Sequence, residues 1–162
     1  MSFVHLRVHS DYSLSDGLCR VKKLPGWVAE RGMPAVALTD QSNLFAMVKF
    51  YRGCLSKGIQ PIVGADVWWG DTHETATPLT LLVQNQAGYL RLSEWLSEGF
   101  LELQKDGRAL IQSRRFAEGT EGLIALFGCL HGGIGQALVK NDQQDAEGKA
   151  PGKKQDSKRD KR

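Results

Sequence analysis

The apolar positions of this 162-residue chain alternate between strand-like and helix-like spacing. Apolar segments at 34–38, 79–83 and 123–127, and a strand-like segment at 60–69, have the length of buried strands. Segments 24–32, 43–56, 88–103 and 133–140 place apolar side chains every third or fourth residue, which predicts amphipathic helices. The segment 107–122 is polar and irregular apart from a possible short turn. Such alternation favours an α/β fold with a parallel sheet or barrel, whose ligands gather at the C-terminal strand ends.

The N-terminal stretch 4–17 joins a β-prone run to a polar turn. In an extended strand, alternate side chains share a face, so His5, Arg7 and His9 should point one way. With Asp11 and Asp16 in the following loop, this face is typical of an active-site rim. Arg7 does not fit a metal site, because a guanidinium stays protonated and offers no lone pair.

Further polar residues follow the other expected strands. Because these strand ends should lie at one edge of the sheet, their side chains are predicted to converge on one site. The residues are His9, Asp16, Asp40, Gln41, Asp66 and Cys129. Asp40 has a plainer alternative role, capping the next helix or holding loop backbone. Cys129 has one too, as a small buried residue.

Composition indicates a soluble globular protein, with 41% hydrophobic and 24% charged residues. No apolar run approaches the roughly 20 residues that a membrane span requires. The N-terminus also lacks the pattern of a signal peptide, so we expect a cytoplasmic protein. Cys19, Cys54 and Cys129 are odd in number and far apart, which argues against a disulfide framework or a zinc ribbon.

The residues 143–162 differ from the rest of the chain. They contain seven Lys or Arg and four Asp or Glu, whereas residues 1–142 have a net charge of zero. With almost no apolar side chains, this tail is expected to be disordered, and residues 1–142 are expected to form one domain. A neutral body predicts no broad footprint for a phosphate backbone. The tail is either a solvated terminus or an electrostatic contact for nucleic acid.

Four segments together resemble the PHP (polymerase and histidinol phosphatase) domain, specifically the one at the N-terminus of bacterial DNA polymerase III alpha subunits. The resemblance covers roughly residues 3–141 and rests on the order and spacing of the segments. They are His5-Leu6-Arg7-Val8-His9-Ser10-Asp11-Tyr12-Ser13 with Asp16-Gly17, Ala37-Leu38-Thr39-Asp40-Gln41-Ser42-Asn43-Leu44, Gly58-Ile59-Gln60-Pro61-Ile62-Val63-Gly64-Ala65-Asp66, and Gly122-Leu123-Ile124-Ala125-Leu126 through Gly128-Cys129.

The resemblance implies a distorted (β/α)7 barrel of the TIM-like type, with metal ions bound at the C-terminal strand ends. Metal-binding members hydrolyse phosphoesters, and those in polymerases can act as 3′–5′ exonucleases. A barrel of this class usually needs well over 200 residues, with roughly 250 typical of the eight-stranded version. This chain supplies about six strands, so we expect a partial barrel with an open edge.

Several expected metal ligands of the family are replaced. Arg7 stands for the first histidine of the HxH motif, Gln41 for the histidine of TDH, and Pro78 for a histidine before the run 79–83. Asp66 stands where the family usually has glutamate. The family pattern is kept at His9, Asp16 and Cys129. Our hypothesis is that Arg7 pairs with Asp16 and Asp66 in place of a metal.

The resemblance therefore predicts a replication protein with a degenerate metal site and no cofactor. We expect a scaffold that docks the proofreading exonuclease subunit and the rest of a replicative polymerase, and that meets DNA only indirectly. Because nothing matches the palm domain, the chain should not polymerise DNA alone. One alternative is an active phosphoesterase or 3′–5′ exonuclease, with Zn or Mn held by His9, Asp16, Asp66 and Cys129. Another is a small nucleic-acid-binding protein that works through its tail.

Overall fold

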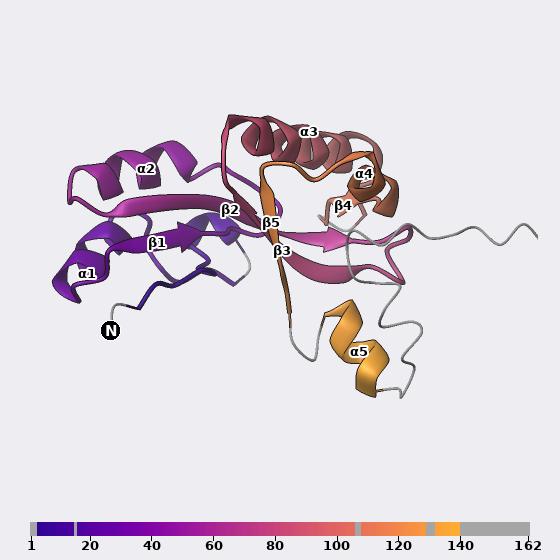
Figure 1. Ribbon diagram of the computed structural model, residues 1–162, viewed down its shortest axis with the longest axis horizontal. Coiled ribbons are helices and arrows are strands. Elements are labelled where there is room, and N and C mark those ends of the chain that lie inside the picture. Colours follow the sequence, from indigo (N-terminus) through magenta and orange to yellow (C-terminus); the bar gives the residue numbers. More distant parts are fainter. Residues whose placement is uncertain (1–2, 15, 106–107, 129–131, 140–162) are drawn as a thin grey trace, which may run out of the picture.

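The computed structural model of the chain describes residues 3–14, 16–105, 108–128 and 132–139. Its strands are β1 (Ala35–Leu38), β2 (Gln60–Trp69), β3 (Thr77–Val83), β4 (Leu110–Ile111) and β5 (Leu123–Phe127). Its helices are the 3-10 turn η1 (Asp11–Ser13), α1 (Leu24–Glu30), α2 (Met47–Leu55), α3 (Gln86–Glu102), α4 (Ser113–Glu118) and α5 (Gly133–Val139). In the view of Figure 1, α2, α3 and α4 lie above the strands and α5 lies below them.

The helices and strands predicted from apolar spacing are present, with shifted ends. Within the segment 107–122, which was expected to be irregular apart from a short turn, the structure has the strand β4 and the short helix α4. Helix α2 begins at Met47 instead of 43, because the Asn43 side chain accepts the backbone N–H of Phe45 and holds a turn there. The predicted N-terminal strand is an extended segment joined to β1 by a single bridge, His5 to Val36.

The sheet is mixed, which corrects the prediction of a parallel arrangement. Its strands lie in the order β1–β2–β3–β5, with β4 beside the end of β2. Only the β1–β2 and β2–β4 pairs are parallel, whereas β2–β3 and β3–β5 are antiparallel. The loop 70–76 is too short for the crossover that a parallel return requires. Apolar spacing carries no information on strand direction, so the pattern could not reveal this. In the described part of the chain, the sheet is open.

Strand β2 changes partners along its length. Residues 60–63 pair with β1, and residues 64–69 pair with β3. The change falls at Gly64. A Cβ atom on Gly64 would overlap the carbonyl oxygen of Leu81. Glycine therefore permits the close approach of the two strands at this point.

Two apolar clusters cover the sheet. The first joins α1 and α2 to β1 through Val21, Leu24, Val28, Val36, Leu38, Ala46, Phe50, Cys54 and Ile59. The second packs α3 against β2 and β3 through Ala65, Val67, Leu79, Leu81, Leu92, Trp95, Leu96 and Ile111. Because side chains alternate along a strand, Asp66 of β2 and Thr80 of β3 point to the opposite face. The candidate site lies on that face.

None of the helices in the described part of the chain combines the length and apolarity that crossing a bilayer requires. Cys129 and the tail 143–162 lie outside the described residues. The disorder of the tail, the domain boundary at 142 and the role of Cys129 therefore stay predictions.

Gly88 and Gly26 provide a test of the packing at the start of α3. Each is the third residue of its helix, but a Cβ on Gly88 would overlap the carbonyl oxygen of Gly122, whereas one on Gly26 meets nothing within 4 Å. We expect Gly88→Ala to lower the free energy of unfolding by about 1–3 kcal/mol through overpacking. The matched control Gly26→Ala should raise it by about 0.5–1 kcal/mol. Urea unfolding measures both, and equal effects would contradict the close contact.

Candidate functional site

The N-terminal segment reaches the site because it lies along β1. The backbone N–H of Ala37 donates to the carbonyl of His5 at 2.8 Å, and that of Thr39 donates to Val8 at 2.9 Å. The Val8 N–H in turn donates to the Thr39 hydroxyl at 3.1 Å. These bonds fix the direction of the segment. As a result, the side chains of Arg7 and His9 reach Asp66 on β2.

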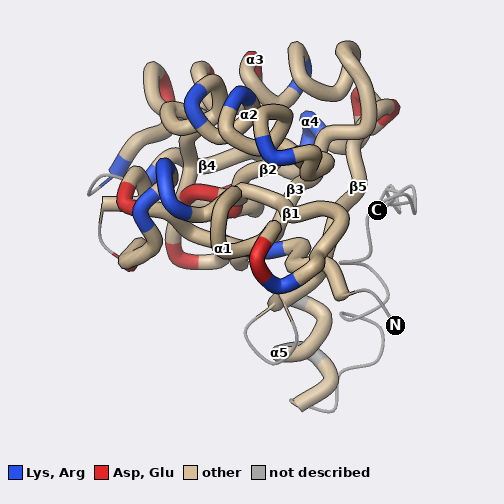
Figure 2. Tube along the Cα trace, turned by 90° about the vertical axis from the view of Figure 1, so that its left-hand side faces the viewer, with Lys and Arg blue, Asp and Glu red and all other residues tan. Residues whose placement is uncertain are grey.

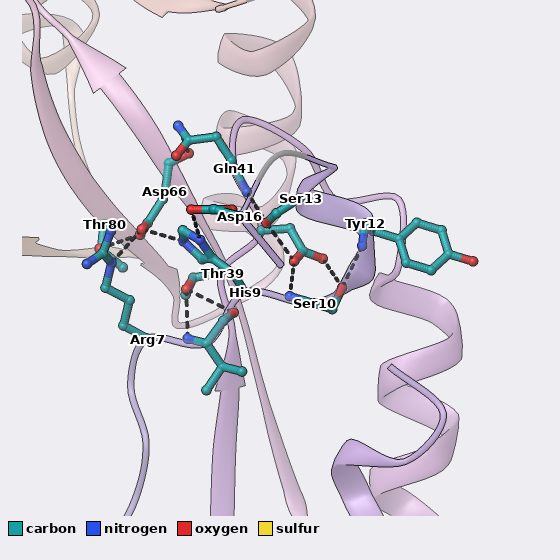
Figure 3. Close-up of polar contacts among 12 residues, drawn as sticks. Arg7, His9, Ser10, Tyr12, Ser13, Asp16, Thr39, Gln41, Asp66 and Thr80 are labelled. Atoms are coloured by element: carbon teal, nitrogen blue, oxygen red, sulfur yellow. Dashed lines mark hydrogen bonds and ion pairs between the residues drawn. The ribbon is translucent and has the colours of Figure 1, made fainter. Parts of the chain in front are cut away.

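Asp66 is the centre of the site. Its side chain is only 4% exposed, yet its carboxylate receives hydrogen bonds from separate parts of the chain. Oδ2 accepts from Arg7 Nε at 2.5 Å and lies 2.7 Å from His9 Nε2. Oδ1 accepts the Thr80 hydroxyl. Figure 3 shows these side chains converging on Asp66 from the N-terminal segment and from β3. A buried carboxylate with this many donors is stable as the charged form.

His9 lies between two carboxylates. Its Nδ1 is 2.7 Å from Asp16 Oδ2, and its Nε2 is 2.7 Å from Asp66 Oδ2. The hydrogen bond with Asp66 is the main cause that raises the pKa of His9 above 6.5, and burial opposes it less strongly. Asp16 raises the pKa further. A doubly protonated ring donates to both carboxylates, so the arrangement stabilises the imidazolium.

The four charged groups balance one another. Burial acts to raise the pKa of Asp66, but hydrogen bonds from His9, Thr80 and Arg7 outweigh it, and the pKa falls below 3.8. With His9 protonated, two carboxylates face one imidazolium and one guanidinium. Arg7 takes Asp66 as its partner, as hypothesised, whereas Asp16 accepts from His9 instead. We call Arg7, His9, Asp16 and Asp66 the Asp66 network.

Asp40 holds the backbone of the loop that carries η1. Its side chain is buried, and its Oδ1 accepts the N–H of Ser10 at 2.6 Å and the hydroxyl of Ser13 at 3.0 Å. Its Oδ2 accepts the Ser10 hydroxyl at 2.8 Å. The sequence left two interpretations of Asp40: a member of the site, or a residue that caps the next helix or holds loop backbone. This geometry corresponds to the second. Asp40 therefore fixes the loop from which His9 and Asp16 reach Asp66.

Gln41 and Pro78, two of the positions predicted to have lost a family ligand, lie on strands β2 and β3 or next to them. Gln41 bridges to Asp66 through the backbone, and its amide Nε2 lies 3.5 Å from the Asp66 carbonyl oxygen. The Gln41 N–H donates to the Ser13 hydroxyl at 2.9 Å. Pro78 lies in β3 opposite Trp68. Cys129 lies outside the described residues. The structure thus brings Arg7, His9, Asp16 and Asp66 into direct contact, with Gln41 at the edge.

Sequence reasoning missed Thr80, which donates to Asp66. The two residues are a direct pair in the antiparallel β2–β3 register. A polar threonine within the apolar run 79–83 was the available signal, because a buried hydroxyl needs a hydrogen-bond partner. The identity of that partner required the register, which local spacing does not give.

The raised pKa of His9 makes the stability of the domain depend on pH. Its contribution is fully present below about pH 6.5 and is lost as the pH rises through the raised pKa. We therefore expect the free energy of unfolding to fall as the pH rises above about 6.5, and this slope to be smaller in His9→Asn. The lowered pKa of Asp66 acts at the acid end, where its contribution is lost as the pH falls below 3.8.

Urea titrations at several pH values measure the slope, with His73→Asn as the matched control. His73 contacts the backbone carbonyl of Leu103, so this variant controls for the loss of a histidine outside the Asp66 network. An unaltered slope in His9→Asn would show that another group causes the pH dependence.

A family model and several curated proteins match most of this chain. The family model described as PHP domain matches residues 5–152. The chain is 47% identical over 149 residues to the DNA polymerase III subunit alpha of Pseudomonas aeruginosa, covering 91% of this chain and 13% of that protein. It is 41% identical over 142 residues to the subunit of the same name from Escherichia coli K12, covering 86% of this chain and 12% of that protein. The chain thus spans about an eighth of the length of these relatives.

Among solved structures, the chain superposes on an amidohydrolase from Chromobacterium violaceum with a TM-score of 0.44 and 22% identity. The superposition covers 59% of this chain and 32% of that one. This similarity is too low to assign a fold. The family model covers most of the chain and includes every residue of the Asp66 network. The chain therefore belongs to the PHP domain family.

Proposed function

We propose that this chain is the PHP module of a replicative DNA polymerase alpha subunit, and that ion pairs replace a metal cluster in its site. The Asp66 network carries the proposal, because it places Arg7 and His9 as cations on the carboxylate that would otherwise face a metal. The matched relatives are alpha subunits of DNA polymerase III, which supports a role in DNA replication.

The donor set does not fit a catalytic metal cluster. Such a cluster needs several free lone pairs from neutral or negative ligands. Both carboxylate oxygens of Asp66 accept protein donors, and both ring nitrogens of His9 face carboxylates. Arg7 adds a permanent positive charge at a family ligand position. These contacts favour a site without a bound Zn or Mn ion.

The same contacts argue against phosphoester hydrolysis. A general base needs a free lone pair directed at the attacking water. The imidazolium form of His9 has none, and the carboxylate of Asp66 is shielded from solvent and satisfied by the protein. The Asp66 network is better suited to holding the N-terminal segment on the sheet. We therefore propose a structural role for these residues, without catalysis.

In this proposal, the module is a scaffold that docks the proofreading exonuclease subunit within the polymerase assembly. Support comes from exposed apolar side chains around the η1 loop. Leu14 is 87% exposed, Leu18 is 97% exposed and Phe45 is 70% exposed. Large apolar side chains that form a contiguous exposed patch are typical of interaction sites. The open mixed sheet is then one wall of a distorted barrel, completed by further polypeptide.

Replacing Arg7 tests whether an ion pair has taken the place of a metal. Arg7→Ala removes a charged donor from the buried Asp66, so the free energy of unfolding should fall by about 1–3 kcal/mol. Chelation by EDTA should leave the melting temperature unchanged. Arg20→Ala is the matched control, because Arg20 is exposed and a surface change of this kind costs less than about 0.5 kcal/mol.

The alternative function, an active metal-dependent phosphoesterase, makes the opposite prediction. It requires a melting temperature that drops on chelation and stoichiometric zinc or manganese in the purified protein. It also requires hydrolysis of bis-p-nitrophenyl phosphate that chelation abolishes. Any one of these results, reproduced in wild type and lost in His9→Asn, would overturn the proposed structural role of the site.

Docking is tested by calorimetric titration of the chain with the proofreading exonuclease subunit of the same replicase. We expect saturable binding with a micromolar or lower dissociation constant, about −8 kcal/mol or stronger. The control is Phe50→Asp, which places a charge in the first apolar cluster and should abolish both the fold and the binding. Absence of binding to the folded wild-type chain would reject the docking role.

A further inference from the structure

The net charge of zero over residues 1–142 conceals a separation of charge along the fold. Residues 17–65, which form α1, β1 and α2, contain seven Lys or Arg and two Asp or Glu. Residues 66–128, which include α3 and α4, contain five Lys or Arg and nine Asp or Glu. The first half thus carries +5 and the second −4. A positively charged region of the surface attracts anionic ligands even where the total charge of the protein cancels.

The cations of the two halves also differ in their partners. In the second half, Arg91, Lys105, Arg114 and Arg115 each form an ion pair with a glutamate. In the first half, all seven Lys and Arg side chains are exposed, and none forms an ion pair with any described carboxylate. Five of the seven lie in the turn before α1 or on α2, and we call them the α1–α2 cation cluster: Arg20, Lys22, Lys23, Lys49 and Arg52.

Contacts on η1 and α1 bring the cluster to one end of the molecule. Asp11 Oδ1 accepts the N–H of Val21 at 3.0 Å, which ties the turn 20–23 to η1. Lys49 of α2 donates to the hydroxyl of Tyr12 in the same η1 turn. Helix α1 packs against α2, and a Cβ on Gly53 would lie 3.0 Å from Pro25 Cγ. Figure 2 views this end of the molecule and shows Lys and Arg positions on α2.

Unpaired cations held together repel one another, and a bound polyanion relieves that repulsion while releasing its counterions. We propose that the α1–α2 cation cluster binds the phosphate backbone of DNA. Phosphates offer one anion per nucleotide at regular spacing, which suits long Lys and Arg side chains that have no carboxylate partner. The contact would recognise the phosphate charges and would not depend on the base sequence. It goes beyond the proposed function, in which the module meets DNA only through the assembly, and it does not depend on exonuclease docking.

Fluorescence anisotropy of the full chain with a labelled 25-nucleotide oligonucleotide, single-stranded and as a duplex, tests the proposal. At low salt we expect a dissociation constant in the micromolar range. The logarithm of the affinity should fall with the logarithm of salt concentration with a slope of about −2 to −4, as for three to five neutralised phosphates. A slope near zero would overturn the proposal.

Two pairs of substitutions locate the contact. Lys22→Gln with Lys23→Gln, and separately Arg20→Gln with Arg52→Gln, should each weaken binding about tenfold or more and reduce the size of the salt slope by roughly 1 to 2. The matched control, Lys105→Gln with Arg114→Gln, changes the charge equally in the other half and should leave the affinity unchanged. All of these side chains are exposed, and thermal melting checks that each variant folds.

Three results would overturn the assignment. Equal weakening by the control pair would show an effect of total charge alone. Unaffected binding in both cluster variants, together with binding of a synthetic 143–162 peptide, would assign the contact to the tail. A competition experiment compares polyglutamate with unlabelled DNA in displacing the labelled oligonucleotide. Displacement by polyglutamate at a lower concentration of negative charge than DNA requires would indicate an acidic protein as the ligand of the cluster.

Discussion

The carboxylate of Asp66 is almost removed from water, and burying such a charge costs several kcal/mol unless donors surround it. Those donors come from the N-terminal segment through Arg7 and His9, and from β3 through Thr80. One buried charge therefore requires three segments of the chain to be in place together. The loop held by Asp40 serves the same requirement, because it delivers His9 and Asp16 to the site.

This requirement is consistent with the proposal that a permanently charged arginine, Arg7, stands at a ligand position of the family. A cluster of carboxylates needs positive charge, and a metal ion is only one way to supply it. Arg7 and protonated His9 supply that charge from the protein itself, with hydrogen bonds whose geometry the fold fixes. The proposed loss of hydrolysis follows from the same contacts, since donors that satisfy a carboxylate also occupy the lone pairs that chemistry would need.

Electrostatics distinguish the two halves of the body as clearly as packing does. Around α3 and α4 the cations are neutralised by neighbouring glutamates, and Arg115 alone meets Glu94, Glu98 and Glu118. Around α1 and α2 they remain unpaired. The summed charge of the chain could not show this, because net charge averages over surfaces that face in different directions. The interpretation of the body as electrostatically neutral was right in total, but the charge is unevenly distributed.

The sequence by itself determined most of the strands and helices, though not β4 and α4, because apolar periodicity is a property of neighbouring residues. It also indicated the family, and it predicted altered ligand positions at Arg7, Gln41 and Pro78. Only the tertiary structure decided the direction of the strands, the register that places Thr80 opposite Asp66, and the choice of Asp66 over Asp16 as the partner of Arg7. These depend on contacts between residues 14 to 59 positions apart. Local spacing cannot encode such contacts, since chain reversal and register arise only when the sheet assembles.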